Sequence, residues 1–192
     1  MYLTRLNRRT QQRAFTLVEL LVTLTVLGVL TAIALPNLRD FIVANRLSSN
    51  VNAFIGVLSY ARSEAIVRNK QVVVCPKSNT TNDCVADEFW GQYEIQIFVD
   101  EDGSDTRNAG DTLIKTIAAV DVARSQFEFI RKEGPNVIKF QSGGMGTNTY
   151  RFDINALKTG DTAYEIKYGR TVCISKPGRT RVRPLTNTCP NL

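Results

Sequence analysis

Residues 15–35, FTLVELLVTLTVLGVLTAIAL, are an apolar stretch of 21 residues in which Glu19 is the only charged residue. As an α-helix at about 1.5 Å per residue, this stretch is roughly 30 Å long, which matches the hydrocarbon core of a bilayer. Residues 1–14 contain four arginines and no acidic residue. Because basic flanks stay on the cytoplasmic side, the sequence predicts a single membrane helix that places the rest of the chain across the membrane.

A second helical pattern follows Pro36. Its apolar positions are spaced by four and three residues, which is the spacing of one helix face; they are Leu47, Val51, Phe54, Leu58, Ala61 and Ala65. The pattern predicts an amphipathic helix that continues to about Arg68 and packs this face on a globular domain.

From Gln71 the sequence changes to short runs rich in β-branched and aromatic residues, separated by turn residues. The alternation of Tyr93, Ile95, Ile97 and Val99 favours half-buried antiparallel strands. The expected strand regions are 71–75, 93–99, 111–120, 126–130, 136–140, 149–154 and 163–175. The sequence therefore predicts an α+β protein in which a long N-terminal helix packs on an antiparallel β domain of one sheet or two small sheets.

The start of the apolar stretch resembles the signal of type IV pilins and type II secretion pseudopilins. It reads RAFTLVELL from Arg13 to Leu21, with a basic leader before it and a glutamate four residues after the phenylalanine. The resemblance implies that a prepilin peptidase cuts between Ala14 and Phe15, where the family usually has glycine before the cut, and methylates the new amino terminus. It also implies that Glu19 pairs with the terminal amine of a neighbouring subunit during filament assembly, which explains a costly charge in a membrane helix.

The globular region is similar to the GspH/FimT family of minor pilins, whose members include FimT-like and FimU-like proteins. The similarity lies in residues 89–114 (FWGQYEIQIFVDEDGSDTRNAGDTLI), 137–146 (VIKFQSGGMG) and 169–182 (GRTVCISKPGRTRV). It implies a type IV pilin-like fold with a leader at 1–14, a transmembrane and assembly helix at 15–36, an amphipathic helix at 37–70 and a β-rich domain with a basic C-terminal loop at 71–192.

The resemblance also implies a location and partners. The chain would be anchored in the inner membrane with its globular domain in the periplasm, and would then enter an extracellular pilus or its tip complex. Its partners would be other major and minor pilins, the prepilin peptidase and the inner-membrane assembly platform. The alternative within the same family is an H-type pseudopilin of a type II secretion system, a structural subunit that does not bind DNA.

Four cysteines allow three disulfide pairings; they are Cys75, Cys84, Cys173 and Cys189. In a domain exported across the membrane, disulfides are favoured over a metal site, because the chain has no histidine and no CxxC pair. The favoured pairing joins Cys75 to Cys84 and Cys173 to Cys189. The second bond would close a loop around the basic tail.

That tail, KPGRTRVRP at residues 176–184, lies in a C-terminal region from Ile166 onward with six basic residues and no acidic one. Two interpretations remain open. The alternating arginines line the solvent face of an edge strand and protect it from aggregation. Alternatively, glycine and proline present them on a loop, where arginines two residues apart, about 6.5 Å along a strand, match the phosphate spacing of nucleic acid.

The family resemblance favours the second interpretation. DNA-binding members of the FimT subgroup act in natural transformation and carry a Gly-Arg-x-Arg motif near the C-terminus, which Gly178, Arg179, Thr180 and Arg181 match here. The expected DNA-binding residues are Gly178, Arg179, Arg181, Arg183, Lys176, Arg170 and Lys167. Tyr168 would add base stacking if it were exposed, although packing is the commoner role of such a residue.

Catalysis has little support in the sequence, because there is no histidine for a general base and no GxxxxGK[ST] phosphate loop. Residues 100–111 (DEDGSDTRNAGD) have the length of a calcium loop, but the glycine comes two positions early and the twelfth residue is Asp instead of Glu. A solvated acidic turn is the favoured interpretation. The sequence therefore predicts a non-enzymatic protein without a cofactor or metal.

Overall fold

The computed structural model describes residues 15–118, 127–156, 166–185 and 188–189, except for the side chains at 36, 37 and 39. The chain divides into two compact units, residues 1–42 and 43–192. In the first unit the described residues from Leu17 onward are helical, with apolar side chains exposed along their length. This segment is the one described helix that is long and apolar enough to cross a membrane.

The helix α1 runs from Leu17 to Arg68, which is where the periodic pattern predicted its end. A Schellman-type cap stops it: Asn69 has a left-handed φ of 51°, and the N–H of Lys70 donates to the carbonyl of Ala65. All six residues of the predicted stripe, from Leu47 to Ala65, are buried in the globular unit. The amphipathic assignment is therefore confirmed.

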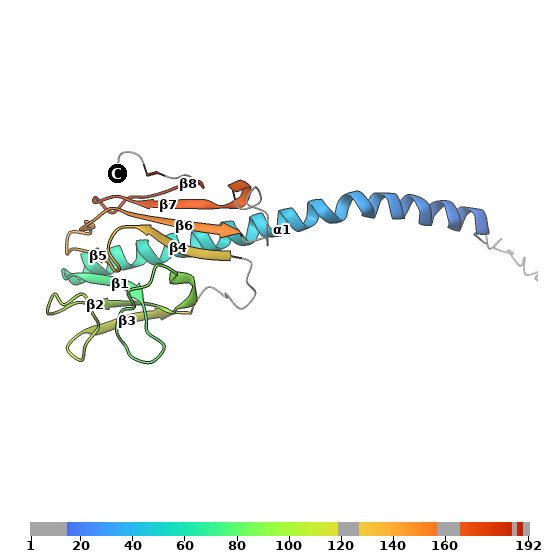
Figure 1. Ribbon diagram of the computed structural model, residues 1–192. Coiled ribbons are helices and arrows are strands. Elements are labelled where there is room, and N and C mark those ends of the chain that lie inside the picture. The colour runs from blue at the N-terminus through green and yellow to red at the C-terminus, as the bar shows by residue number, and fades with distance from the viewer. Residues whose placement is uncertain (1–14, 119–126, 157–165, 186–187, 190–192) are drawn as a thin grey trace, which may run out of the picture. The chain divides into compact units, whose positions relative to one another are not determined.

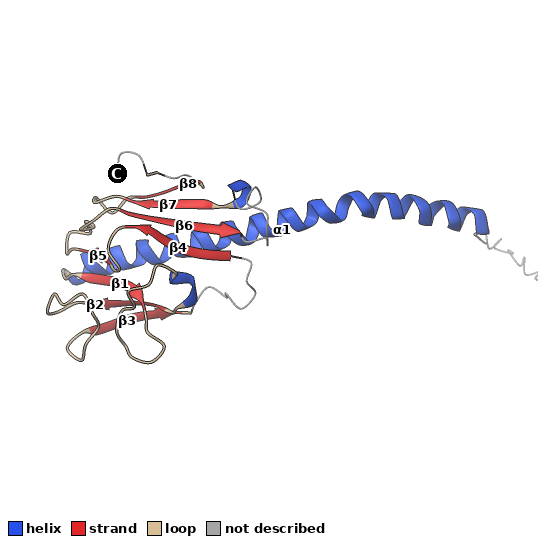
Figure 2. Ribbon diagram, viewed as in Figure 1, coloured by secondary structure: helices blue, strands red, loops and turns tan. Residues whose placement is uncertain are grey.

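In the described part of the chain, eight strands follow the helix and form two antiparallel four-stranded sheets (Figures 1 and 2). One sheet has the order β3-β2-β1-β5, and the other has the order β4-β6-β7-β8. The strand bounds are β1 Val72–Pro76, β2 Ile95–Val99, β3 Thr112–Ile117, β4 Phe127–Glu133, β5 Ile138–Phe140, β6 Tyr150–Ala156, β7 Arg170–Ile174 and β8 Thr180–Pro184. The predicted α+β class and antiparallel pairing are confirmed.

The second half of α1 lies against both sheets (Figure 1), and an aromatic cluster joins it to the sheet that contains β4 and β6. Phe152 of β6 is fully buried, and its ring centroid lies 5.0 Å from that of Phe54 on α1 and 4.9 Å from that of Trp90. Trp90 belongs to a short 3₁₀ helix, Trp90–Gln92, and Phe129 of β4 stacks on Phe152 at 5.4 Å. Edge-to-face and stacked rings of this kind add to the stability gained by burying apolar area.

One prediction about the sheet was wrong. Strand β2 was expected to be half-buried, but all of its residues are buried. The loop that includes Cys84 covers the face of β2 opposite the helix: Phe98 packs with Cys75 there, and the Gln96 side chain donates to the Asn82 carbonyl at 2.8 Å. The alternating pattern could not reveal this covering, because a loop supplies it.

The last predicted strand region was also too long. Residues 163–175 were expected to be one strand, whereas the described part forms strand β7 only from Arg170, with residues 166–168 helical. The extra strand β8 supplies the edge of this sheet.

Candidate functional site

The basic segment forms a β-hairpin with β7. Residues 175–179 join the strands, and the Ser175 N–H donates to the Arg179 carbonyl at 3.0 Å, which leaves a three-residue turn, Lys176 to Gly178, at the tip. Gly178 is buried with a left-handed φ of 76°, the position that such hairpin loops usually give to glycine. The expected basic loop is thus a tight turn followed by an edge strand. The edge strand pairs with β7 along its whole length, from Thr180 opposite Ile174 to Pro184 opposite Arg170.

The arginines of the hairpin are accessible. Arg179 and Arg181 are exposed and Arg183 is half-buried, and no described carboxylate forms an ion pair with any of them. The register places Arg181 opposite Cys173 and Arg183 opposite Thr171. Since paired residues of adjacent strands share a face, Arg181 and Arg183 project on the same side of the sheet.

The basic residues that were expected to act together do not all lie in one place. Lys176 lies exposed in the turn, three residues before Arg179. Arg170 lies at the other end of the hairpin, opposite Pro184, and its guanidinium donates to the carbonyls of Tyr168 and Gly169 at 3.1 and 2.8 Å. The Lys167 ammonium lies 4.8 Å from the centre of the Tyr168 ring. Arg170 and Lys167 are therefore engaged locally and lie apart from the turn.

Tyr168 is part of the hydrophobic core, with 7% of its surface exposed. The possibility that it stacks on a base is excluded by this burial, and the packing interpretation is correct.

Both disulfides of the favoured pairing are present, Cys75–Cys84 and Cys173–Cys189. Cys173 lies in the middle of β7, directly opposite Arg181, so the second bond encloses the turn and β8. A loop of this size is worth about 3 kcal/mol in the chain-entropy account of cross-links. The bond thus restricts the chain on both sides of the basic hairpin.

A groove of about 530 Å³ separates the second half of α1 from the start of β8. Its lining contains Arg62 of the helix together with Gly178, Arg179 and Arg181 of the hairpin. The Arg62 Nη1 donates to the Gly178 carbonyl at 3.3 Å. Sequence reasoning missed Arg62, because this residue only flanks the buried stripe and lies 116 positions from its partner.

The predicted assembly residue, Glu19, is exposed in the first turn of α1. Thr16 precedes this helix, and its Oγ1 accepts a hydrogen bond from the Glu19 N–H at 3.2 Å. Threonine followed three residues later by glutamate is a capping-box pattern, so the sequence also marks the start of the helix here. Phe15 is exposed, whereas Ala14 lies outside the described residues.

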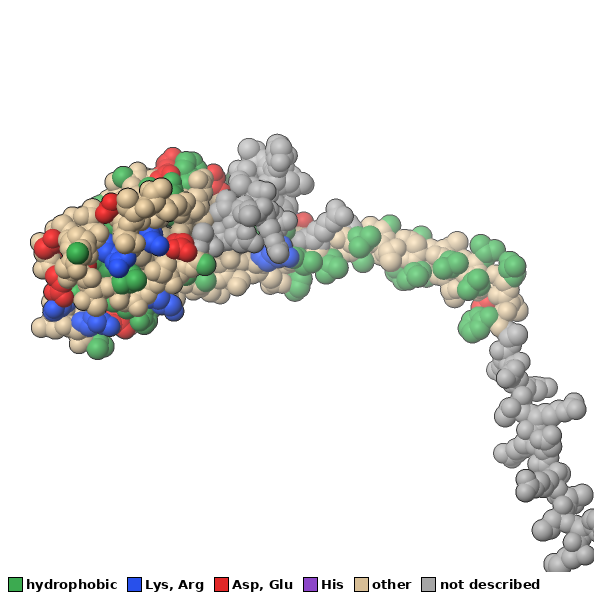
Figure 3. Space-filling view, turned by 90° about the horizontal axis from the view of Figure 1, so that it is seen from below, with side chains coloured by type: hydrophobic (Ala, Val, Ile, Leu, Met, Phe, Trp, Pro, Cys, Tyr) green, Lys and Arg blue, Asp and Glu red, His purple; other side chains and the backbone are tan. Residues whose placement is uncertain are grey.

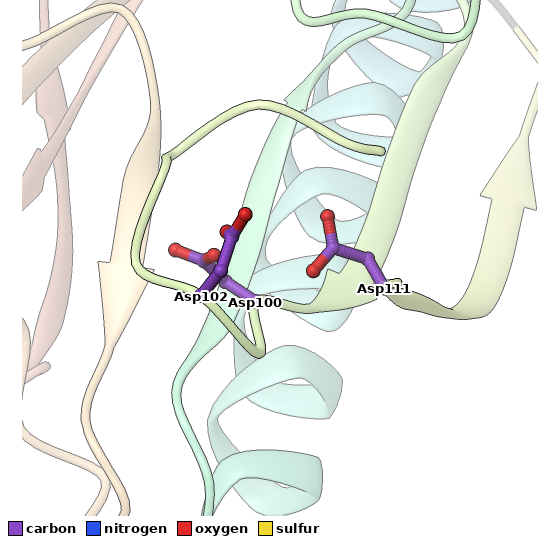
Figure 4. Close-up of side chains that lie close together, drawn as sticks. All are labelled: Asp100, Asp102 and Asp111. Carbon is purple, nitrogen blue, oxygen red and sulfur yellow. The ribbon is translucent and has the colours of Figure 1, made fainter. Parts of the chain in front are cut away.

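The acidic turn holds Asp100, Asp102 and Asp111 with carboxylate oxygens within 4.8 Å of one another (Figure 4). Their oxygens accept hydrogen bonds from the loop itself: Asp100 from the Gly103 N–H at 2.9 Å, and Asp111 from the Glu101 N–H at 3.0 Å. Hydrogen bonds from Ser104 hold the pKa of the Asp102 carboxyl below its ordinary value. These hydrogen bonds explain why the three carboxylates lie close together: they hold the loop in its turn.

Another face of the molecule carries both acidic and basic side chains, unlike the basic hairpin of β7 and β8. In the view of Figure 3, acidic and basic side chains are mixed over the globular unit, while hydrophobic side chains follow the N-terminal helix. The arginines of β8, which have no ion-pair partner among the described residues, therefore contrast with the mixed charges of this face.

Comparisons with known proteins agree with the fold. The family described as "Type II transport protein GspH" matches residues 50–178, and the prokaryotic N-terminal methylation motif matches residues 9–35. The crystal structure of the type IV minor pilin FimU of Pseudomonas aeruginosa superimposes with a TM-score of 0.53 at 22% identity, over 73% of this chain and 90% of that one.

Curated relatives match a shorter region. The type IV major fimbrial protein FimA of Dichelobacter nodosus is 29% identical over 102 residues, which are 52% of this chain and 61% of the relative. A fimbrial protein of Pseudomonas aeruginosa is 29% identical over 100 residues, 48% of this chain and 64% of the relative. The chain thus spans about three-fifths of the length of these relatives.

Proposed function

Since the chain belongs to the GspH family of pilins and pseudopilins, which are structural proteins and not enzymes, we propose that it is a minor subunit of a type IV pilus that also captures DNA. The methylation motif at residues 9–35 supports processing at Ala14 and Phe15. The processed subunit would leave the inner membrane and join other pilins through the assembly platform, at the pilus tip where minor pilins help start the filament.

Glu19 is the proposed assembly residue. Its side chain is exposed on the apolar helix and has no ion-pair partner among the described residues. A carboxylate at membrane depth costs at least about 2.5 kcal/mol near the bilayer centre. The methylated amine of Phe15 from a neighbouring subunit would provide the missing positive partner when the helices pack.

The observation that supports DNA capture is the hairpin of β7 and β8, which presents Arg179 and Arg181 exposed and without a described carboxylate partner. Phosphate contacts from arginines position a nucleic acid without reading its bases. The proposed role is therefore capture of DNA of any sequence for natural transformation, with Arg183, Lys176, Arg170 and Lys167 adding to the positive field.

The second candidate function is an H-type pseudopilin of a type II secretion system. It is favoured by the description of the matched family as a type II transport protein. In that case the arginines of β8 would only protect an exposed sheet edge from pairing with another chain.

DNA binding by the chain without its basic leader, beginning at Phe15 and held in an uncharged detergent, tests the proposal. We expect unrelated duplexes to bind alike. The variant Arg179→Gln, Arg181→Gln, Arg183→Gln should lose affinity on the order of 100-fold, because each arginine makes a charge-assisted contact. Three phosphate contacts also predict a loss of about 40-fold in wild-type affinity between 50 and 200 mM salt. Fluorescence anisotropy with labelled duplexes measures both quantities.

The matched control removes three basic side chains that already have carboxylate partners, through Arg68→Gln, Lys70→Gln and Lys77→Gln. These residues pair with Glu64, Glu101 and Glu94. The control should bind DNA nearly as well as the wild type. Equal losses of DNA affinity in both triple variants would mean that only the net charge of the protein matters. A folded wild type that binds no DNA at low salt would favour the pseudopilin.

A further inference from the structure

The groove between α1 and β8 brings together side chains from two distant parts of the sequence. Arginines line it from both sides, Arg62 from the helix and Arg179 and Arg181 from the hairpin. The lining also includes the hydroxyl residues Ser59, Ser63 and Thr180 and the apolar residues Ile55, Leu58 and Ile66. No described residue of the lining is acidic.

The positive charges of this groove are not neutralised within the described part of the chain. Neither Arg62 nor Arg179 nor Arg181 forms an ion pair with a described carboxylate. Arg62 is half-buried, and its Nε is buried without a hydrogen-bond partner among the described residues. Convergent like charges repel, and a partly desolvated guanidinium without a counter-ion is costly. An anion in the groove would remove both costs.

Two glycine turns pack closely beside the groove. A Cβ on Gly178 would lie 2.8 Å from the Gly144 carbonyl, and a Cβ on Gly144 would lie 2.6 Å from the Ile66 Cδ1. Two glycine turns thus pack against each other and against α1, and Arg62 contacts the junction through its bond to the Gly178 carbonyl. Substituting either glycine with a larger residue would strain this junction.

We propose that this groove is a phosphodiester-binding site that holds one strand of the DNA backbone, with Arg62 as the inner donor and Arg179 and Arg181 as the outer donors. This inference rests on the proposed function and locates its binding site. A guanidinium presents five N–H donors in a planar fork that matches phosphate oxygens, and only one hydrogen bond of Arg62 is formed with described residues. A phosphodiester suits the lining because its charge faces the arginines and its sugar faces Ile55 and Ile66.

The groove site differs from simple binding to the outer face of the sheet. Arg183 is outside the groove lining, whereas Arg62 is inside it. A groove site therefore makes the helix part of the DNA interface and gives Arg62 a larger share of the affinity than Arg183. Binding on the outer face of β8 would give the opposite order.

The first test is Arg62→Gln in the chain that begins at Phe15, titrated with a labelled duplex at several salt concentrations. Affinity should fall about tenfold, the size expected for one charge-assisted contact. The slope of log affinity against log salt should become shallower by about 0.9, the value for one phosphate. Arg62→Lys should retain the wild-type slope because it keeps the charge. A role limited to supporting the turn would leave all three slopes equal, which would contradict the proposal.

The second test keeps the Arg62 side chain and changes the charge of the groove at another position. Ser59→Glu places a carboxylate on the exposed wall of the groove, and Ser49→Glu places one at an exposed position of the same helix, about 15 Å away at 1.5 Å per residue. This separation exceeds the Debye length of about 8 Å at physiological salt. Ser59→Glu should weaken DNA binding about tenfold, and Ser49→Glu should change it by less than about twofold.

The outcomes separate the two proposals. If Arg179→Gln with Arg181→Gln abolishes binding while Arg62→Gln and Ser59→Glu have no specific effect, DNA binds outside the groove and only this inference fails. If the wild type binds no DNA, the proposed function and the inference fail together. If the groove variants instead lower incorporation into filaments with DNA binding intact, the groove holds a neighbouring subunit, which also overturns the inference.

Discussion

Replacing Glu19 with alanine should remove the chain from assembled filaments while leaving it in the membrane. In the proposed assembly, Glu19 is paired with the amine of Phe15 from a neighbouring subunit, in an environment with little water. Breaking a buried ion pair by removing one partner costs about 3–5 kcal/mol, because the other charge stays unpaired. Incorporation should therefore fall on the order of 100-fold or more. Quantitative immunoblots of sheared filaments and of the membrane fraction measure both pools.

A separate control is needed for Thr16, which caps the start of the helix. Thr16 accepts a hydrogen bond from the backbone N–H of Glu19, and this bond does not depend on the glutamate side chain. Glu19→Gln keeps the backbone bond and removes only the charge, so it should fail as Glu19→Ala does. Thr16→Ser keeps a capping hydroxyl and should assemble normally. Wild-type amounts of Glu19→Gln in filaments would show that the carboxylate has no charge-pairing role.

Replacing Phe152 with alanine should destabilise the globular unit by about 3–5 kcal/mol, the usual cost of removing a large buried aromatic side chain. Phe152 is fully buried among Phe54, Trp90 and Phe129, so the cavity would open where the helix meets strands β4 and β6. The midpoint of thermal unfolding should fall by roughly 10 °C. Trp90 is the only tryptophan of the chain, and its fluorescence follows this core during denaturant unfolding.

Phe41→Ala is the matched control for this core variant. Phe41 belongs to the other compact unit and has 64% of its surface exposed. Its removal should leave the free energy of unfolding of the globular unit unchanged. A loss of less than about 1 kcal/mol in Phe152→Ala would contradict the packing of α1 on the aromatic cluster, because cavities of that size cost more.

The regular elements could be predicted from the sequence because their signals are periodic. The stripe from Leu47 to Ala65 repeats at helical spacing, and each of its residues is buried as expected. Residues 93–99 alternate as a strand does, and β2 forms there. The burial of its second face was not predictable, since a loop tethered by Cys75–Cys84 covers it.

The candidate site was predictable only in part. The motif of Gly178, Arg179 and Arg181 is local in sequence and could be recognised there. Arg62 reaches this motif only through the packing of α1 beside β8, across 116 positions, and no local pattern encodes that contact. Conversely, Arg170 is near the motif in sequence, but the hairpin register moves it to the far end, where it donates to the carbonyl of Gly169.

The most direct test of a pilus subunit is mass spectrometry of type IV pili sheared from cells that express the chain. We expect a minor amount of the chain in the filaments, with peptides that begin at a methylated Phe15, and loss of DNA uptake when its gene is deleted. Pili that lack the chain, together with a deletion strain that takes up DNA normally but no longer exports type II secretion substrates, would contradict the proposal and identify a pseudopilin.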